Sequence, residues 1–268
     1  MTPWLEVCRS AAADVRQVLE DLPSRVEREP VLATGVGGDD TTAIDAAAEQ
    51  AVVTRLEELH RQGHEFLLVS EELGERSFGG GETRVVVDPI DGSVNAKRGL
   101  RHFCLSVAVA EGPSFGDVVY GYLYDFGSGE EWTAAQGGGA ALDGRPLGDV
   151  RPKEQVEILA LEGTLSAAVA DKAAALAGYA RRFRITGSLA LSLCQLAAGR
   201  VDAVCSLRGA RAVDVAAAQL VVRECGLAIG FADARPWNAA PLDTAPQSIV
   251  VAAATEESRD RLGAILSM

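Results

Sequence analysis

The sequence predicts an α/β protein in which layers of helices and sheets alternate. Two observations support this prediction. Short apolar segments rich in β-branched residues alternate with longer segments whose apolar residues recur at helical spacing, most regularly in the second half of the chain. The chain also has 268 residues, 48% of them hydrophobic, which is enough to bury a sizeable core. This alternation favours two sheets sandwiched by helices, an α-β-α-β-α arrangement.

The first half is expected to combine two long helices with a sheet. Residues 4–20 carry apolar side chains near helical spacing, and Thr41 and Thr42 can cap a second helix that ends at Gly63. The pattern then changes to that of short buried strands. The other elements expected in this half are a glycine-rich loop over 31–41 and strands over 66–69, 84–87, 103–111, 117–124, 130–135 and 139–142.

The second half is expected to alternate strands with helices that end at glycines. Gly, Pro and charged residues gather over 143–153, so we predict an N-terminal α+β half over 1–147 and a C-terminal α/β half over 148–268. The elements expected after this boundary are strands over 158–161, 183–185, 201–205 and 248–252, helices over 166–177, 188–198 and 212–224, and a final helix.

Charge and composition limit the partners of the chain. The net charge of −13 repels nucleic acid and anionic membranes at long range, so neither is expected to bind. The same charge would repel a phosphorylated molecule unless metal ions or local arginines reversed the field. No apolar segment approaches the roughly 20 residues of a membrane-spanning helix, and the first residues do not resemble a secretion signal. We therefore expect a cytoplasmic protein.

Cysteine and histidine usage argues against two other classes of site. The five cysteines are odd in number and form no Cys-x-x-Cys pair. Cys104, Cys194 and Cys205 lie in apolar segments, so we expect them to be small core residues in a reducing compartment. Three histidines offer little for a zinc site.

The most informative segment surrounds two aspartates. A buried strand, Val85–Val87, leads into Asp88, and Pro89 has no N–H with which to continue a strand ladder. We therefore expect the chain to turn at Pro89, with Asp91 one turn away from Asp88. Asp-Pro-x-Asp-Gly is also an ordinary turn sequence, so this segment gains meaning only together with the other acids.

The residues beside these aspartates suit an anion. Gly92 and Ser93 can open a helix whose N–H groups point outward, where they can bind a phosphate. The Ile90 carbonyl adds an oxygen next to the two carboxylates. Oxygen ligands beside a helix start suit hard divalent cations that hold a phosphate.

Further acids lie at strand ends and helix starts. Packed together, such carboxylates would raise one another's pKa unless a metal neutralised them. For Asp214, at the start of an apolar helix, capping of the helix is an alternative to cation binding. The acids concerned are Asp39, Asp40, Asp45, Glu71, Glu72 and Asp214.

In this order the acidic motifs resemble the inositol monophosphatase superfamily of lithium-sensitive, magnesium-dependent phosphatases. The family pattern is an acidic pair at a strand end, then Asp-Pro-Ile/Leu-Asp-Gly-Ser/Thr, then a late Asp-x-Ala-Ala. The corresponding segments here are Glu71-Glu72, Asp88 to Ser93, and Asp214 to Ala217. The resemblance covers roughly residues 35–226 and implies the layered α-β-α-β-α sandwich of sugar phosphatases, commonly as a homodimer.

The resemblance also implies roles for individual residues. Glu71, Asp88, the Ile90 carbonyl and Asp91 would hold the first Mg²⁺ ions, and Asp214 would complete the second site. Two or three ions are implied, since Asp39 or Asp40 could hold or screen a third. The other implied roles are water orientation by Ser93 and Asp45 together with Glu71, an outer position for Glu72, and phosphate binding by the N–H groups of Gly92 and Ser93.

The substrate implied is a small polyol or sugar phosphate. Arg208 and Arg211 resemble the arginine pattern of archaeal-type enzymes that act on inositol monophosphate and fructose 1,6-bisphosphate, and a guanidinium could pair with a second phosphate. Arg208 could instead face solvent. Gly187 and Ser188 could form part of the substrate wall or merely cap a helix.

Two other classes of function stay open, and a third is excluded. A related phosphatase could act on histidinol phosphate or on 3'-phosphoadenosine 5'-phosphate. The chain could also be a regulatory protein that keeps the fold and binds a partner, although its intact acidic set argues against this. A calcium-binding EF-hand does not fit, because its ligands lie within about twelve residues.

Overall fold

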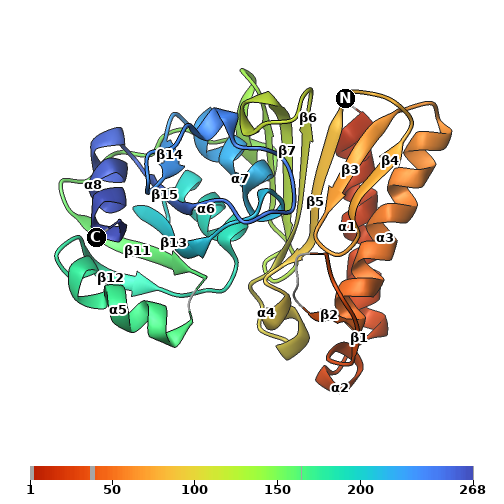
Figure 1. Cartoon of the computed structure of the whole chain (residues 1–268), viewed down its shortest axis with the longest axis horizontal. Coiled ribbons are helices and arrows are strands. Elements are labelled where there is room, and N and C mark those ends of the chain that lie inside the picture. Colours follow the sequence, from red (N-terminus) through yellow and green to blue (C-terminus); the bar gives the residue numbers. More distant parts are fainter. Residues whose placement is uncertain (1–2, 37–39, 164, 268) are drawn as a thin grey trace.

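The computed structural model describes residues 3–36, 40–163 and 165–267. Helices and sheets alternate in layers, in the order helices, sheet, helices, sheet, helices, from one side of the molecule to the other (Figure 1). The predicted α/β layered sandwich is therefore confirmed.

The first layer consists of two long helices, α1 (Pro3–Asp21) and α3 (Ala43–Arg61). Their apolar faces cover one side of the larger sheet, as expected from the spacing of apolar residues. A short helix that the sequence did not predict, α2 (Arg25–Arg28), follows α1. The buried Arg28 guanidinium donates to the carbonyls of Leu22 and Ala96, at 2.5 and 2.8 Å, and so ties the end of α1 to α4 (Ser93–Arg98).

The larger sheet has eight strands in the order β10-β9-β8-β7-β6-β5-β3-β4. Neighbouring strands are antiparallel except β3 and β5, which are parallel, so the carboxyl ends of these two strands lie at the same edge. The strands are β3 (Phe66–Ser70), β4 (Gly74–Phe78), β5 (Arg84–Asp91), β6 (Cys104–Ala110), β7 (Val118–Asp125), β8 (Glu131–Ala135), β9 (Gly139–Leu142) and β10 (Arg145–Pro146).

The turn expected at Pro89 is wrong. Strand β5 continues through Pro89 to Asp91, and a β-bulge accommodates the proline: Asp88 is paired with Ser106, but Asp91 is already paired with Cys104. Pro89 and Ile90 thus lie opposite a single residue, so the missing N–H of proline costs no regular ladder bond. The bulge brings both aspartates to the end of one strand.

The loop expected over 31–41 is also wrong in part. Its described residues form a small antiparallel sheet of β1 (Val31–Thr34) and β2 (Asp40–Thr42), which precedes α3. The Thr42 N–H and hydroxyl donate to Asp45 at 3.1 and 2.5 Å, so Thr42 is the cap of α3.

The smaller sheet has five strands in the order β12-β11-β13-β15-β14. The bounds of three of its strands, β11, β12 and β13, differ from the predicted ranges by two to four residues at one end or both, and β14 was not predicted. The strands are β11 (Val156–Glu162), β12 (Ala180–Arg184), β13 (Ala203–Gly209), β14 (Ala228–Phe231) and β15 (Ile249–Ala253). Helices α5 (Ser166–Leu176) and α8 (Glu256–Leu266) form the outer layer on this sheet.

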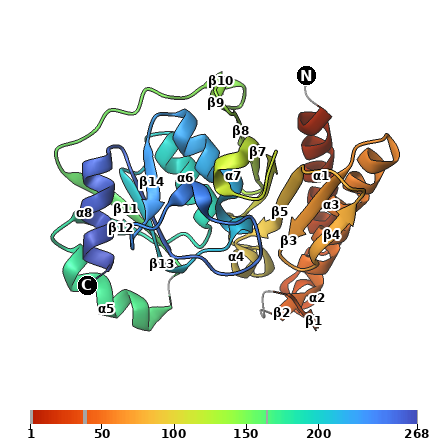
Figure 2. The same cartoon turned by 45° about the horizontal axis from the view of Figure 1, so that its top comes forward.

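Between the two sheets lie α6 (Leu189–Ala197) and α7 (Ala212–Glu224), whose side chains are almost all buried. They belong to one apolar cluster that includes residues of both sheets, such as Val86 and Val204. A long connection over 147–155 joins the two sheets along one side (Figure 2). The boundary at residue 147 stays a prediction, because the core is continuous across it. Two 3₁₀ turns, Phe115–Asp117 and Trp237–Ala239, complete the described elements.

All five cysteines are buried and unpaired, including Cys104, Cys194 and Cys205, which were expected in the core. Within the described ranges, we find no helix with the length and apolar content that a membrane crossing requires.

Candidate active site

A pocket of about 670 Å³ opens where the strand ends of the two sheets face each other. Strands β3, β5, β11 and β13 all direct their carboxyl ends toward it, and α7 begins beside it. The predicted site residues that line it are Asp40, Asp45, Glu71, Glu72, Asp88, Ile90, Asp91, Gly92, Ser93, Gly187, Arg208, Arg211 and Asp214. Asp39 lies outside the described residues, and Ser188 does not line the pocket.

Three carboxylates from distant parts of the chain converge at the base of this pocket. Glu71 follows β3, Asp88 lies in β5, and Asp214 lies in the first turn of α7. One oxygen from each lies within 4.8 Å of the other two. In the described part of the chain, this is the only group of at least three acidic, histidine or cysteine ligands that is close enough to hold one metal ion.

Arg211 lies against the same acids. Its Nη2 atom is 2.5 Å from Glu71 and 3.3 Å from Asp214, and its side chain is only 11% exposed. Burial by itself lowers the pKa of Arg211, but Asp214, Glu71 and Asp88 together raise it above its usual value. The guanidinium therefore stays charged and neutralises part of the cluster. Its described ion pairs are with acids of this chain, although the sequence suggested that it binds substrate.

We expect Arg211→Met to destabilise the protein in EDTA by about 3 kcal/mol, since it leaves buried carboxylates without their cation. Saturating Mg²⁺ should then raise the unfolding midpoint more in Arg211→Met than in the wild type. Thermal unfolding with EDTA and with Mg²⁺ measures both effects. Arg208→Met is the matched control, because Arg208, near the end of β13, is exposed. An unchanged midpoint in EDTA would argue against this role of Arg211.

Asp91 accepts hydrogen bonds from the start of α6. The Ser188 hydroxyl donates to Asp91 Oδ2 at 2.5 Å, and the Ala190 N–H donates to the same oxygen at 2.8 Å. Ser188 also accepts from the Leu191 N–H at 3.2 Å, as the cap of α6. Ser188 is 1% exposed, so its hydroxyl orients Asp91 and does not form the pocket wall.

Burial and mutual repulsion raise the pKa values of Glu71, Asp88 and Asp91. Burial raises the pKa of Glu71 to about 7 and that of Asp91 to about 8, and Asp214 adds to both shifts. Burial, then Glu71, Asp91 and Asp214, raise the pKa of Asp88 well above its usual range. Closely packed carboxylates with such shifts fit a site for hard divalent cations, which favour oxygen ligands and would offset the repulsion.

The residues expected to orient water, Glu71, Asp45 and Ser93, all line the pocket. Asp45 accepts from Thr42, and Ser93 is the first residue of α4, directly after Gly92. Gly92 has φ +100°, and a Cβ there would lie 3.1 Å from the His102 carbonyl, so a glycine is needed. Glu72 accepts a hydrogen bond from the Thr41 hydroxyl.

Two charged residues of the pocket, Lys97 and Glu162, were not predicted as site residues. Lys97 lies in the last turn of α4 and lines the pocket. Glu162 ends β11 and was overlooked, although it carries the same signal as Glu71, an acid at the end of an apolar strand. Its side chain is 2% exposed.

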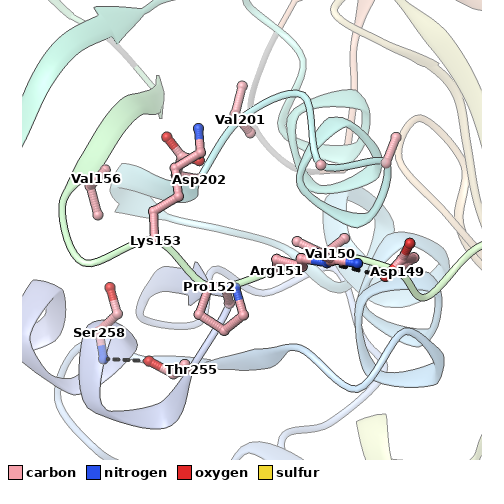
Figure 3. Close-up of a pocket in the computed structure, with 13 residues that line it drawn as sticks. Asp149, Val150, Arg151, Pro152, Lys153, Val156, Val201, Asp202, Thr255 and Ser258 are labelled. Atoms are coloured by element: carbon pink, nitrogen blue, oxygen red, sulfur yellow. Dashed lines mark hydrogen bonds and ion pairs between the residues drawn. The ribbon is translucent and has the colours of Figure 1, made fainter.

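A second cavity, of about 210 Å³, lies beneath the 149–153 segment, between β11 and the start of α8 (Figure 3). Two of the charged side chains that line it are paired with each other, because Lys153 Nζ lies 2.9 Å from Asp202. Asp202 also accepts from the N–H groups of Glu157 and Ile158, both at 2.9 Å. These bonds give the charged groups a structural role, so we assign the chemistry to the larger pocket.

Comparisons with known proteins agree with this geometry. The model of the "Inositol monophosphatase family" matches residues 2–267. A "Fructose-1,6-bisphosphatase/inositol-1-monophosphatase" of Methanothermobacter thermautotrophicus is 31% identical over 234 residues, which cover 83% of this chain and 82% of the relative. A "Nus factor SuhB" of Pasteurella multocida is 30% identical, with 84% of each chain covered. A crystal structure described as an inositol monophosphatase–fructose 1,6-bisphosphatase superposes with a TM-score of 0.85 at 27% identity, covering 98% of this chain and all of the other.

Proposed function

Since this chain belongs to the inositol monophosphatase family, we propose that it is a magnesium-dependent phosphomonoesterase for a small polyol or sugar phosphate. The family match confirms the family that was predicted from the acidic motifs. Inositol monophosphate and fructose 1,6-bisphosphate are the substrates that we propose, in line with the names of the archaeal relatives.

The observation that carries the proposal is the convergence of Glu71, Asp88 and Asp214 in one pocket, with Asp91 oriented beside them. We propose that these four carboxylates and the Ile90 carbonyl hold two Mg²⁺ ions, and that Asp40 or Asp39 screens a third. When bound, the ions would supply positive charge that offsets the phosphate and lowers the pKa of a nearby water.

The other pocket residues would position the reactants. Gly92 and Ser93 lie at the start of α4, where N–H groups can donate to phosphate oxygens. Glu71, Ser93 and Asp45 would orient the attacking water, and Gly187 would form part of the substrate wall. The chain has a net charge of −13, so the ions, together with Lys97 and Arg208 of the pocket, would supply the positive charge that a phosphate ester requires.

We expect Arg208→Ala to reduce kcat/KM for a bisphosphate by about tenfold and to leave a monophosphate nearly unchanged, because an exposed pair with a second phosphate contributes about 1.4 kcal/mol. Arg208 is exposed at the pocket mouth, with its Cγ close to Gly163. Steady-state kinetics with fructose 1,6-bisphosphate and inositol monophosphate provide the comparison. Arg101→Ala, an exposed arginine outside the pocket, is the control. Equal losses for the two substrates would remove the case for a second-phosphate site.

The proposed function is tested by phosphate release from a panel of substrates with Mg²⁺ and with EDTA. Release from inositol monophosphate or fructose 1,6-bisphosphate that requires Mg²⁺ is the expected result. Preferential release from histidinol phosphate or 3'-phosphoadenosine 5'-phosphate would favour those related activities. No release from any member of the panel would contradict a phosphatase and favour a regulatory protein, an alternative that the similarity to Nus factors supports.

We further propose that the protein is a homodimer in the cytoplasm. Family resemblance supports the first point, and the five buried, unpaired thiols fit a reducing compartment. Light scattering of the purified protein tests the dimer, and a monomer mass would contradict it.

A further inference from the structure

The segment Thr186–Ser188, here called the 186–188 loop, links β12 to α6 and reaches the acids of the larger sheet. Ser188 and the Ala190 N–H both bind Asp91 at Oδ2. In the described part of the chain, Asp91 Oδ1 accepts no hydrogen bond, so this oxygen is available to coordinate a cation. The position of the 186–188 loop therefore decides which way the Asp91 carboxylate faces.

Glu162 fixes this loop from the side of the smaller sheet. Its carboxylate accepts hydrogen bonds from the Thr186 hydroxyl at 2.7 Å, the Gly187 N–H at 2.8 Å and the Ser192 hydroxyl at 2.7 Å. A carboxylate that is 2% exposed is costly unless it is fully hydrogen-bonded. Burial of Glu162 is thus compensated by bonds to the loop and to α6, and none of these donors belongs to the acidic cluster.

Asn95 fixes the same loop from the side of the larger sheet. Its Nδ2 atom donates to the carbonyls of Thr186 and His102, both at 2.7 Å. Gly187 has φ +92°, and a Cβ there would lie 2.8 Å from Asn95 Nδ2, so the loop packs directly on this side chain. Held from both sides, the loop has one position, and that position places Ser188 on Asp91.

We propose that Glu162 is a positioning residue for the cation site, acting through the 186–188 loop on Asp91. This inference rests on the proposed function in one respect, namely that Asp91 is a ligand of Mg²⁺. Glu162 itself turns its oxygens to the loop and α6. Outer hydrogen bonds that orient a ligand of a metal are commonly needed for full affinity.

The test is a double-mutant cycle of Glu162→Gln and Ser188→Ala, with Mg²⁺ affinity measured by calorimetry without substrate. Glutamine keeps the size of Glu162 but turns an NH₂ group toward donors, so the loop loses its anchor. We expect each single variant to weaken Mg²⁺ binding about tenfold. The double variant should bind Mg²⁺ about as tightly as the single variant with the lower affinity. Glu157→Gln, half-exposed on the same strand, should bind Mg²⁺ like the wild type.

Two results would overturn the inference. An unchanged Mg²⁺ dissociation constant in Glu162→Gln would show that Glu162 serves stability alone. Losses that add up in the double variant would show that Glu162 acts independently of Ser188, for example as a direct ligand. If Glu162→Gln does not fold, Thr186→Val replaces it in the same cycle, because it removes one donor to Glu162 and leaves the carboxylate in place.

The result of the double-mutant cycle can be told apart from the result of the phosphate-release test of the proposed function. A wild-type chain that binds Mg²⁺ but releases no phosphate would contradict the phosphatase and leave the cycle on Mg²⁺ affinity valid. A wild-type chain that binds no Mg²⁺ would overturn both proposals.

Discussion

Asp91→Asn is expected to lower magnesium-dependent phosphate release by at least about a thousandfold, because several kcal/mol of charge stabilisation depend on the ions. The substitution keeps the shape of the side chain but removes its negative charge. The amide oxygen of the variant side chain can still accept the Ala190 N–H, and the buried cluster loses a repelling charge. The fold should therefore persist, with an unfolding midpoint in EDTA no lower than that of the wild type.

Kinetics at several Mg²⁺ concentrations and circular dichroism measure these two expectations. Asp125→Asn is the matched control, since Asp125 is equally buried but binds the N–H of Gly127 and the Ser128 hydroxyl, outside the pocket. The folded Asp125→Asn protein should keep its turnover. Near-normal turnover in Asp91→Asn would contradict the assignment of Asp91 to the ions.

A second large effect is expected in the pH dependence of stability without divalent cations. The folded chain binds protons more tightly than the unfolded chain at Glu71 and Asp91, where burial raises the pKa from 4.5 to about 7 and from 3.8 to about 8. A raised acid pKa means that stability falls as pH rises from the unfolded value to the folded one. In EDTA the free energy of unfolding should therefore fall by a few kcal/mol between about pH 5 and about pH 8.

Urea denaturation at several pH values, with EDTA and with Mg²⁺, tests this expectation. Mg²⁺ binds the ionised carboxylates, so its stabilising effect should grow with pH. Glu71→Gln should reduce the slope of the free energy of unfolding against pH in EDTA. Part of the slope should remain, because burial also raises the pKa of Glu49 to about 7. Stability in EDTA that is constant over this pH range would show that the acids are ionised at no cost.

The acids of the pocket could be predicted from the sequence because each is marked by the segment next to it and because these segments follow one another in a set order. Each acid follows an apolar strand or begins an apolar helix, and parallel strands β3 and β5 bring Glu71 and Asp88 to one edge. Asp214 joins them because α7 packs against the larger sheet. The position of each acid therefore depends on a short segment whose apolar pattern can be recognised in the sequence.

Other features depend on contacts between distant segments and carry no local signal. Arg211 meets Glu71 across 140 residues, and Ser188 meets Asp91 across 97. From the sequence, both looked like substrate residues or ordinary caps. Strand β4 was missed because its middle residues are exposed and polar, so only its pairing with β3 makes it a strand. The bulge at Pro89 likewise needs strand β6 as a partner.

The burial of α6 and α7 between the two sheets has a consequence for biosynthesis. Until these helices emerge, one whole face of the larger sheet has no cover, although all eight of its strands precede residue 147. A ribosome-bound chain that stops before α6 would expose that apolar face to solvent and to other chains. Truncated chains should therefore aggregate or recruit chaperones, and productive folding waits for the late helices.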